Sequence, residues 1–83
     1  MTYKIAFKKS VGRDLKKIGI EQVERILLKI EETLAKTPKK CPLLPGKFAG
    51  LRKFRVGDYR VIFTILDDTV LILRVSHRKE SYR

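Results

Sequence analysis

The sequence contains one cysteine, one histidine and no tryptophan among its 83 residues. The cysteine, Cys41, has no second cysteine with which to form an internal disulfide. Cysteine and histidine are also too few to build a structural zinc site, so we expect neither a metal nor a cofactor. A chain of this length forms one domain, residues 1–83, whose stability must come from packing of a modest core.

A long apolar run is also missing. No stretch approaches the roughly 20 consecutive apolar residues that span a bilayer. The residues from Met1 to Phe7 are too polar for a signal peptide. We therefore expect a cytoplasmic protein that does not bind a membrane.

Acidic residues are few, because nine Asp and Glu face twenty Lys and Arg, which gives a formal net charge of +11. On so small a surface this charge creates a strongly positive field and favours a polyanionic partner. Nucleic acid is the first candidate, since phosphate neutralisation with counterion release supplies most sequence-independent affinity. A chain that is simply well solvated, or that binds acidic lipid or an acidic protein, is the alternative.

The first half of the chain predicts one strand followed by two helices. Residues 2–8 alternate apolar and polar side chains, as a half-buried strand does. Ser10 is expected to cap a short helix that Gly19 ends. Residues 20–36 carry an apolar stripe at helical spacing, and Pro38 ends that helix. The stripe, which we expect to be core, consists of Ile20, Val23, Ile26, Leu27, Ile30 and Leu34.

The second half predicts an antiparallel meander. Residues 39–46 contain too many helix and strand breakers for regular structure, so they form a loop across the sheet edge. Three alternating runs then follow, separated by the two-residue turns Gly57-Asp58 and Asp67-Asp68. The expected fold is α+β with the order β-α-α-β-β-β, a helical hairpin packed on one face of a mainly antiparallel four-stranded sheet. The three runs are residues 51–56, 59–66 and 69–77.

Side-chain alternation sorts the meander into two faces. The expected core face consists of Phe54, Val56, Tyr59, Val61, Phe63, Ile65, Leu71, Leu73 and Val75. The opposite face, which we call the basic face, consists of Lys53, Arg55, Arg60, Ile62, Thr64, Arg74, Ser76 and Arg78. Like charges on neighbouring strands repel, so this arrangement favours a site that binds phosphate. Long cationic side chains that simply extend into solvent are the other explanation.

Two segments resemble the signatures of the RelE/ParE toxin superfamily of type II toxin–antitoxin systems. They are Leu51-Arg52-Lys53-Phe54-Arg55-Val56-Gly57-Asp58-Tyr59-Arg60-Val61-Ile62-Phe63 and Val75-Ser76-His77-Arg78-Lys79-Glu80-Ser81-Tyr82-Arg83. The expected order of elements is also similar, so the resemblance covers essentially the whole chain. In the RelE-like branch it implies a toxin that enters the ribosomal A site and cleaves mRNA there. A ribose 2′-hydroxyl attacks the adjacent phosphate and leaves a 2′,3′-cyclic phosphate.

The family's working residues correspond to Lys53, Arg55, Arg60, Arg78 and Tyr82. Arg55 and Arg60 are expected to hold the scissile phosphate, because guanidinium groups pair with phosphate oxygens. Lys53 adds positive charge or, in its neutral form, acts as the general base. Arg78 neutralises the leaving oxygen, and Tyr82 stacks on a codon base or orients the ribose.

Further residues have more open roles. His77 is either an acid or base, since imidazole titrates near neutral pH, or a packing residue on the apolar side. Additional RNA contacts are expected from Arg52, Arg74, Lys79 and Arg83. The resemblance implies as partners a cognate antitoxin with an acidic segment that folds on binding, the ribosome, mRNA, and operator DNA through the antitoxin complex. A ParE-like action on DNA gyrase, or a non-catalytic RNA-binding module, are the alternative functions.

Overall fold

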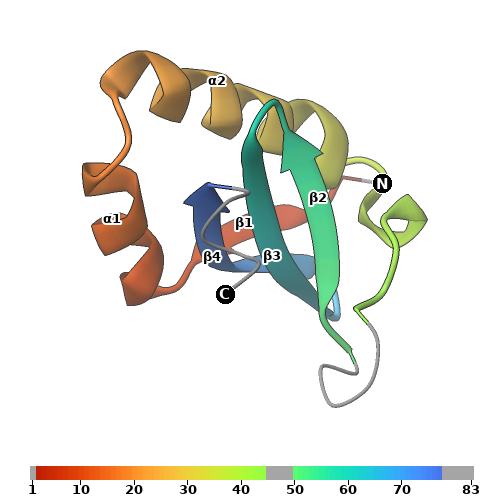
Figure 1. The fold of residues 1–83 in the computed structure, drawn as a ribbon. Helices are drawn as coiled ribbons and strands as arrows, with labels where there is room; N and C mark the ends of the chain where they lie inside the picture. The colour runs from red at the N-terminus through yellow and green to blue at the C-terminus, as the bar shows by residue number, and fades with distance from the viewer. Residues whose placement is uncertain (1, 45–49, 78–83) are drawn as a thin grey trace.

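The computed structural model describes residues 2–44 and 50–77. Its four-stranded sheet has the order β1-β4-β3-β2, with β1 parallel to β4 and the other neighbours antiparallel. The helices lie on one side of this sheet (Figure 1), which confirms the predicted α+β fold. The elements are β1 (Lys4–Phe7), α1 (Lys9–Lys16), α2 (Ile20–Lys29), a π-helical turn (Ile30–Leu34), a 3₁₀ turn (Pro38–Lys40), β2 (Arg52–Val56), β3 (Tyr59–Leu66) and β4 (Thr69–His77).

Both predicted hairpin turns are confirmed. Val56 pairs with Tyr59 and Leu66 pairs with Thr69, so each turn contains two residues. The first turn residue has a positive φ in both cases, 58° at Gly57 and 54° at Asp67. Gly and Asp tolerate this conformation better than most residues do, and it gives the chain the reversal that a two-residue hairpin needs.

The core lies between α2 and the covered face of the sheet. Ile26, Ile30 and Leu34 from the helical stripe contact the strands, and all three side chains are fully buried. The prediction that the whole stripe is core was wrong for Ile20, which begins α2 and is 75% exposed. The sheet contributes Val56, Val61, Phe63, Val70, Ile72 and Val75 to the same cluster.

A β-bulge changes which face the β4 side chains occupy. The β3–β4 register shifts between Ile62, which pairs with Arg74, and Phe63, which pairs with Ile72. Leu73 is therefore the extra residue, and alternation breaks there. The prediction of Leu71 and Leu73 as core was wrong. Val70 and Ile72 are buried instead, and Val75 remains buried.

Helix α1 covers the edge of β4 where β1 has ended. The Ser10 hydroxyl donates to the Leu73 carbonyl at 3.0 Å. The carboxylate of Asp14 accepts from the Val75 backbone N–H at 3.0 Å and from Arg74 Nε at 3.1 Å. These contacts satisfy polar groups of an otherwise open strand edge.

Neither predicted boundary of the first helix was correct. Ser10 is not the N-cap, since α1 begins at Lys9 and Lys8 occupies the cap position. Gly19 does not end α1 either, because it is the N-cap of α2, whose first residue follows it. The contact of Ser10 with a distant strand explains the first error, because a local capping rule does not consider such a partner.

Within residues 2–44 and 50–77, no helix has the length and apolar composition required to cross a membrane.

We predict that Asp14→Ala lowers the free energy of unfolding by about 1–3 kcal/mol, because it removes the charged acceptor of a part-buried backbone N–H. The measurement is urea denaturation followed by circular dichroism. Glu31→Ala is the matched control, since Glu31 is exposed and carries the same charge. We expect this control to change stability by less than about 0.5 kcal/mol. Equal effects of both variants would show that Asp14 stabilises the fold only through its contribution to net charge.

Candidate nucleic-acid interface

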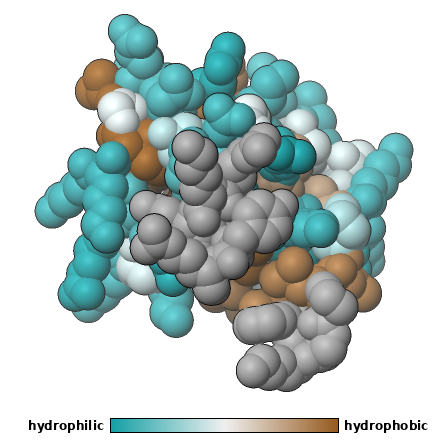
Figure 2. Space-filling model, viewed as in Figure 1, coloured by the Kyte–Doolittle hydropathy of each residue, from teal (hydrophilic) through white to brown (hydrophobic). Residues whose placement is uncertain are grey.

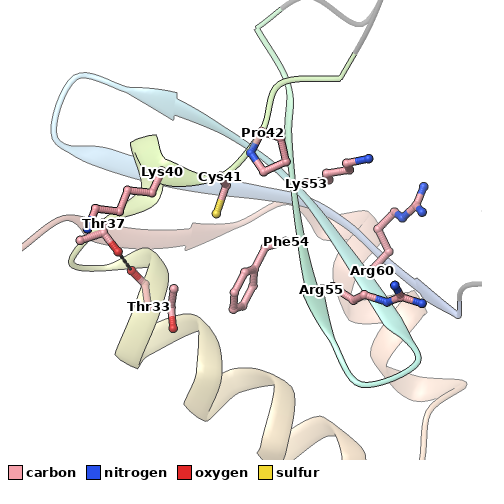
Figure 3. Close-up of a pocket in the computed structure, with 9 residues that line it drawn as sticks. All are labelled: Thr33, Thr37, Lys40, Cys41, Pro42, Lys53, Phe54, Arg55 and Arg60. Atoms are coloured by element: carbon pink, nitrogen blue, oxygen red, sulfur yellow. Dashed lines mark hydrogen bonds between the residues drawn. The ribbon is translucent and has the colours of Figure 1, made fainter.

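Three cations from β2 and β3 lie together on the side of the sheet opposite α2. Arg55 and Arg60 are direct cross-strand partners, and Lys53 pairs with Ile62. In Figure 3 the side chains of Lys53, Arg55 and Arg60 extend to one side of β2, while Phe54 points toward the helix. The structure therefore brings together three of the residues predicted for catalysis.

Lys53 and Arg55 have no carboxylate partner among the described residues, 2–44 and 50–77. Arg74, which the register also places on the basic face, is different because Asp14 binds its guanidinium. Directly opposed like charges destabilise a sheet. An anionic ligand beside Arg55 and Arg60 would remove that repulsion.

Arg52 is not part of this group. It pairs with Phe63 and so faces the helical side of the sheet. Its guanidinium donates to the carbonyls of Lys39 at 3.2 Å and Cys41 at 2.7 Å. Arg52 thus anchors the connection that precedes β2, and its role as an additional RNA contact stays a prediction.

His77 lies at the end of β4, opposite Tyr59. The two rings meet edge to face, with centroids 5.3 Å apart and an interplanar angle of 90°. This contact gives His77 a packing role beside an aromatic residue. Whether it also transfers a proton stays a hypothesis. Four other residues of the predicted site, Arg78, Lys79, Tyr82 and Arg83, lie outside the described part of the chain.

A groove of about 420 Å³ runs along β2 between the basic face and the end of the helical layer. Phe54 forms an apolar surface inside it, and Thr33 and Thr37 line the helical side (Figure 3). Sequence analysis did not identify this groove. No short sequence signal predicts it, because Thr33 lies in the π-helical turn and Thr37 lies in the connection after that turn. The remaining lining residues are Lys40, Cys41, Pro42, Lys53, Arg55 and Arg60.

The thiol of Cys41, which lines this groove, has a raised pKa. Burial raises the pKa of its thiol, and the nearby Arg52 guanidinium lowers it to a smaller extent. The net shift is upward, so the thiol stays protonated to higher pH than a free cysteine does. Over the described ranges, no cluster of His, Cys, Asp and Glu could hold a metal ion.

The described surface in the view of Figure 2 is largely polar. Figure 2 shows hydrophilic side chains over most of the described surface in this view, with smaller apolar areas between them. Such a surface suits a charged ligand that makes contacts with many side chains, as a nucleic-acid backbone does.

Known proteins with similar sequences and folds identify the class of this chain. Residues 5–82 match the family described as the ParE toxin of the type II toxin–antitoxin system parDE. The chain is 37% identical over 90 aligned positions to toxin RelG of Mycobacterium tuberculosis, covering 100% of this chain and 99% of RelG. The chain belongs to the RelE/ParE family of type II toxin–antitoxin toxins.

Solved structures of relatives agree with this assignment. The toxin–antitoxin complex RelBE2 from Mycobacterium tuberculosis contains a chain with a TM-score of 0.81 and 30% identity, covering 94% of this chain and 100% of that one. The RelB–RelE antitoxin–toxin complex from Methanococcus jannaschii gives a TM-score of 0.69 and 30% identity, covering 93% and 94%. Both similar structures are complexes with an antitoxin.

We predict that Cys41 of the folded protein reacts with iodoacetamide several-fold more slowly at neutral pH than it does in denaturant. The raised pKa leaves less thiolate, which is the reactive form. The rate should increase as pH rises past the ordinary pKa of a cysteine thiol. Mass spectrometry of quenched samples measures it, and a small thiol compound serves as the control. Equal rates in folded and denatured protein would contradict the effect of burial.

Proposed function

We propose that the chain is a ribosome-dependent endoribonuclease that cleaves mRNA in the A site and thereby inhibits translation in the cytoplasm. The observation that carries this proposal is the direct pairing of Arg55 with Arg60, with Lys53 on the same face. Two guanidinium groups on adjacent strands can contact oxygens of one phosphate. The 37% identity to a protein named as a Rel toxin supports the RelE-like branch.

The reaction needs no metal in this proposal. The 2′-hydroxyl loses its proton to a base as its oxygen bonds to phosphorus, and the bond from phosphorus to the 5′-oxygen breaks. Arg55 and Arg60 stabilise the additional negative charge of the pentacoordinate phosphorus. Lys53 accepts the proton in its neutral form, or stabilises charge in its protonated form. The products are a 2′,3′-cyclic phosphate and a 5′-hydroxyl.

Two further roles rest on the resemblance of residues 75–83 to the family signature. Arg78 would neutralise the leaving 5′-oxygen, which then takes a proton from solvent. Tyr82 would stack on a codon base or orient the attacking ribose. The partners in this proposal are a cognate antitoxin, the ribosome and mRNA, with operator DNA bound only through the antitoxin complex. The antitoxin complexes of the similar Mycobacterium and Methanococcus structures support the first partner.

A ParE-like action on DNA gyrase is the second candidate, because the matching family is described by its ParE toxin. The two activities differ in their product. If the chain is an endoribonuclease, a cell-free translation system stops and contains cleaved mRNA. If it acts on gyrase, gyrase is found trapped on cleaved DNA instead.

We predict that Arg60→Ala lowers the rate of mRNA cleavage on programmed ribosomes by roughly 100-fold or more, because it removes a donor to the developing charge. Arg78→Ala should have a comparable effect on the leaving oxygen. Primer extension that maps mRNA 5′ ends measures both rates.

The control for these variants is Arg25→Ala, which removes the same charge from an exposed position of α2. We expect it to cleave at nearly the wild-type rate. Thermal denaturation shows whether each variant is folded. Wild-type rates in both Arg60→Ala and Arg78→Ala would exclude these residues from the mechanism.

A further inference from the structure

Phe54 supplies the aromatic surface of the groove along β2. Its side chain extends from β2 toward the end of the helical layer (Figure 3). The residue packs against the core but is only half-buried, so part of its surface is accessible from the groove. An accessible aromatic ring in a groove is a surface on which a planar ligand can stack.

The groove wall that precedes β2 is fixed by hydrogen bonds. The Arg52 guanidinium donates to the Cys41 carbonyl at 2.7 Å and to the Lys39 carbonyl at 3.2 Å. The Lys53 backbone N–H donates to the Pro42 carbonyl at 3.1 Å. Cys41 and Pro42, which line the groove, are therefore held in place without a ligand. The volume of about 420 Å³ is in the range of pockets that bind small molecules.

The helical wall of the groove carries hydroxyl groups. Thr37 donates its hydroxyl proton to the Thr33 carbonyl at 3.3 Å. The oxygen of that hydroxyl retains lone pairs that can accept a hydrogen bond from a ligand. Because Thr37 lines the groove, this acceptor suits an amino group at the edge of a planar ring.

The remaining polar lining of the groove is positively charged. It consists of Lys40, Lys53, Arg55 and Arg60, and no carboxylate of the described residues lines the groove. A ligand that matches both features has a planar ring for the aromatic wall and a negative charge for the cations. A nucleotide combines the two in one molecule.

The outer edge of β2 is open where such a ligand passes from one side of the sheet to the other. Lys53 and Arg55 point over the basic face, whereas Phe54 between them points toward the helical side. Among residues 2–44 and 50–77, no strand or bridge pairs with the outer edge from Phe54 to Val56. A nucleotide can therefore place its phosphate on the basic face, its sugar across this edge and its base in the groove.

We propose that the groove binds one nucleobase of single-stranded RNA, turned out from its neighbours, while the phosphate of the same nucleotide lies on Arg55 and Arg60. The base stacks on Phe54, and the Thr37 hydroxyl accepts from an amino group of the base. Proteins read single-stranded RNA largely through such unstacked bases. The inference rests on the proposed function for the identity of the nucleic acid, whereas stacking of a base on Phe54 requires no cleavage.

The test compares two small probes that differ only in the base. One is 2′-deoxyadenosine 3′,5′-bisphosphate, and the other is its abasic analogue, which has the same phosphates and no bond that the proposed reaction could cleave. We expect the full chain to bind the adenine probe about tenfold more tightly, because base–aromatic stacking adds to the phosphate contacts. Nuclear magnetic resonance titration at low ionic strength measures both affinities. Only the adenine probe should shift the Phe54 ring resonances and slow alkylation of Cys41, which lines the groove.

A matched pair of variants locates the stacking surface. Phe54→Leu keeps an apolar side chain but removes the ring, and should reduce the preference for the adenine probe to about twofold or less. Phe7→Leu makes the same change at a side chain that is 46% exposed and lies outside the groove, and should leave the preference unchanged. Melting curves identify a variant that fails to fold, and the resonance shifts and alkylation of the wild-type chain decide in that case.

Three outcomes would overturn the inference. Equal affinities of the wild-type chain for the two probes would show that charge alone attracts them. An unchanged preference in folded Phe54→Leu would place the base elsewhere, and absence of binding would show that the groove is not a nucleotide site. These outcomes are separate from the proposed function, which is tested by mRNA cleavage on ribosomes. A base preference without such cleavage would reject the endoribonuclease and retain the base site, and cleavage without a base preference would do the reverse.

Discussion

The direct opposition of Arg55 and Arg60 across β2 and β3 is the constraint on which this account depends. The two-residue turn at Gly57-Asp58 fixes the register, so the backbone positions of Arg55 and Arg60 stay opposite each other while the hairpin is intact. The other face of the same strands is buried against α2. The cations of β2 and β3 are therefore held on the opposite face of the sheet. The fold therefore holds two cationic residues directly opposite each other, where one anionic ligand can contact both.

Asp14 shows how the molecule balances one cation and leaves others available. It binds Arg74 through its carboxylate while also accepting the Val75 N–H, so α1 is attached to the sheet at the same point. Lys53 and Arg55 have no comparable ion pair within the described ranges. The difference separates a cation that stabilises the fold from cations that are available to a ligand or to an acidic partner.

Much of the architecture could be predicted because it depends on local patterns. Apolar spacing identified the long helix, and short Gly and Asp turns identified the meander and its register. Alternation along β2 and β3 then placed Lys53, Arg55 and Arg60 on one face, as the structure confirms.

The errors occurred where distant residues decide the local structure. The bulge at Leu73 is associated with Ser10, which hydrogen-bonds its carbonyl. The contacts of Arg52 with two carbonyls of the preceding connection were not predicted either. The groove along β2 forms only when the end of the helical layer meets the edge strand. None of these contacts has a signature within a short window of sequence.

The most direct test of the central claim is the rate of ribosome-programmed mRNA cleavage by Arg55→Gln, measured on protein shown to be folded. Glutamine preserves much of the side-chain length and removes the charge that opposes Arg60. The account predicts that cleavage falls strongly while stability is unchanged or slightly higher, because a repulsive pair has been removed. Wild-type cleavage by the folded variant would contradict the claim that these paired cations bind the scissile phosphate.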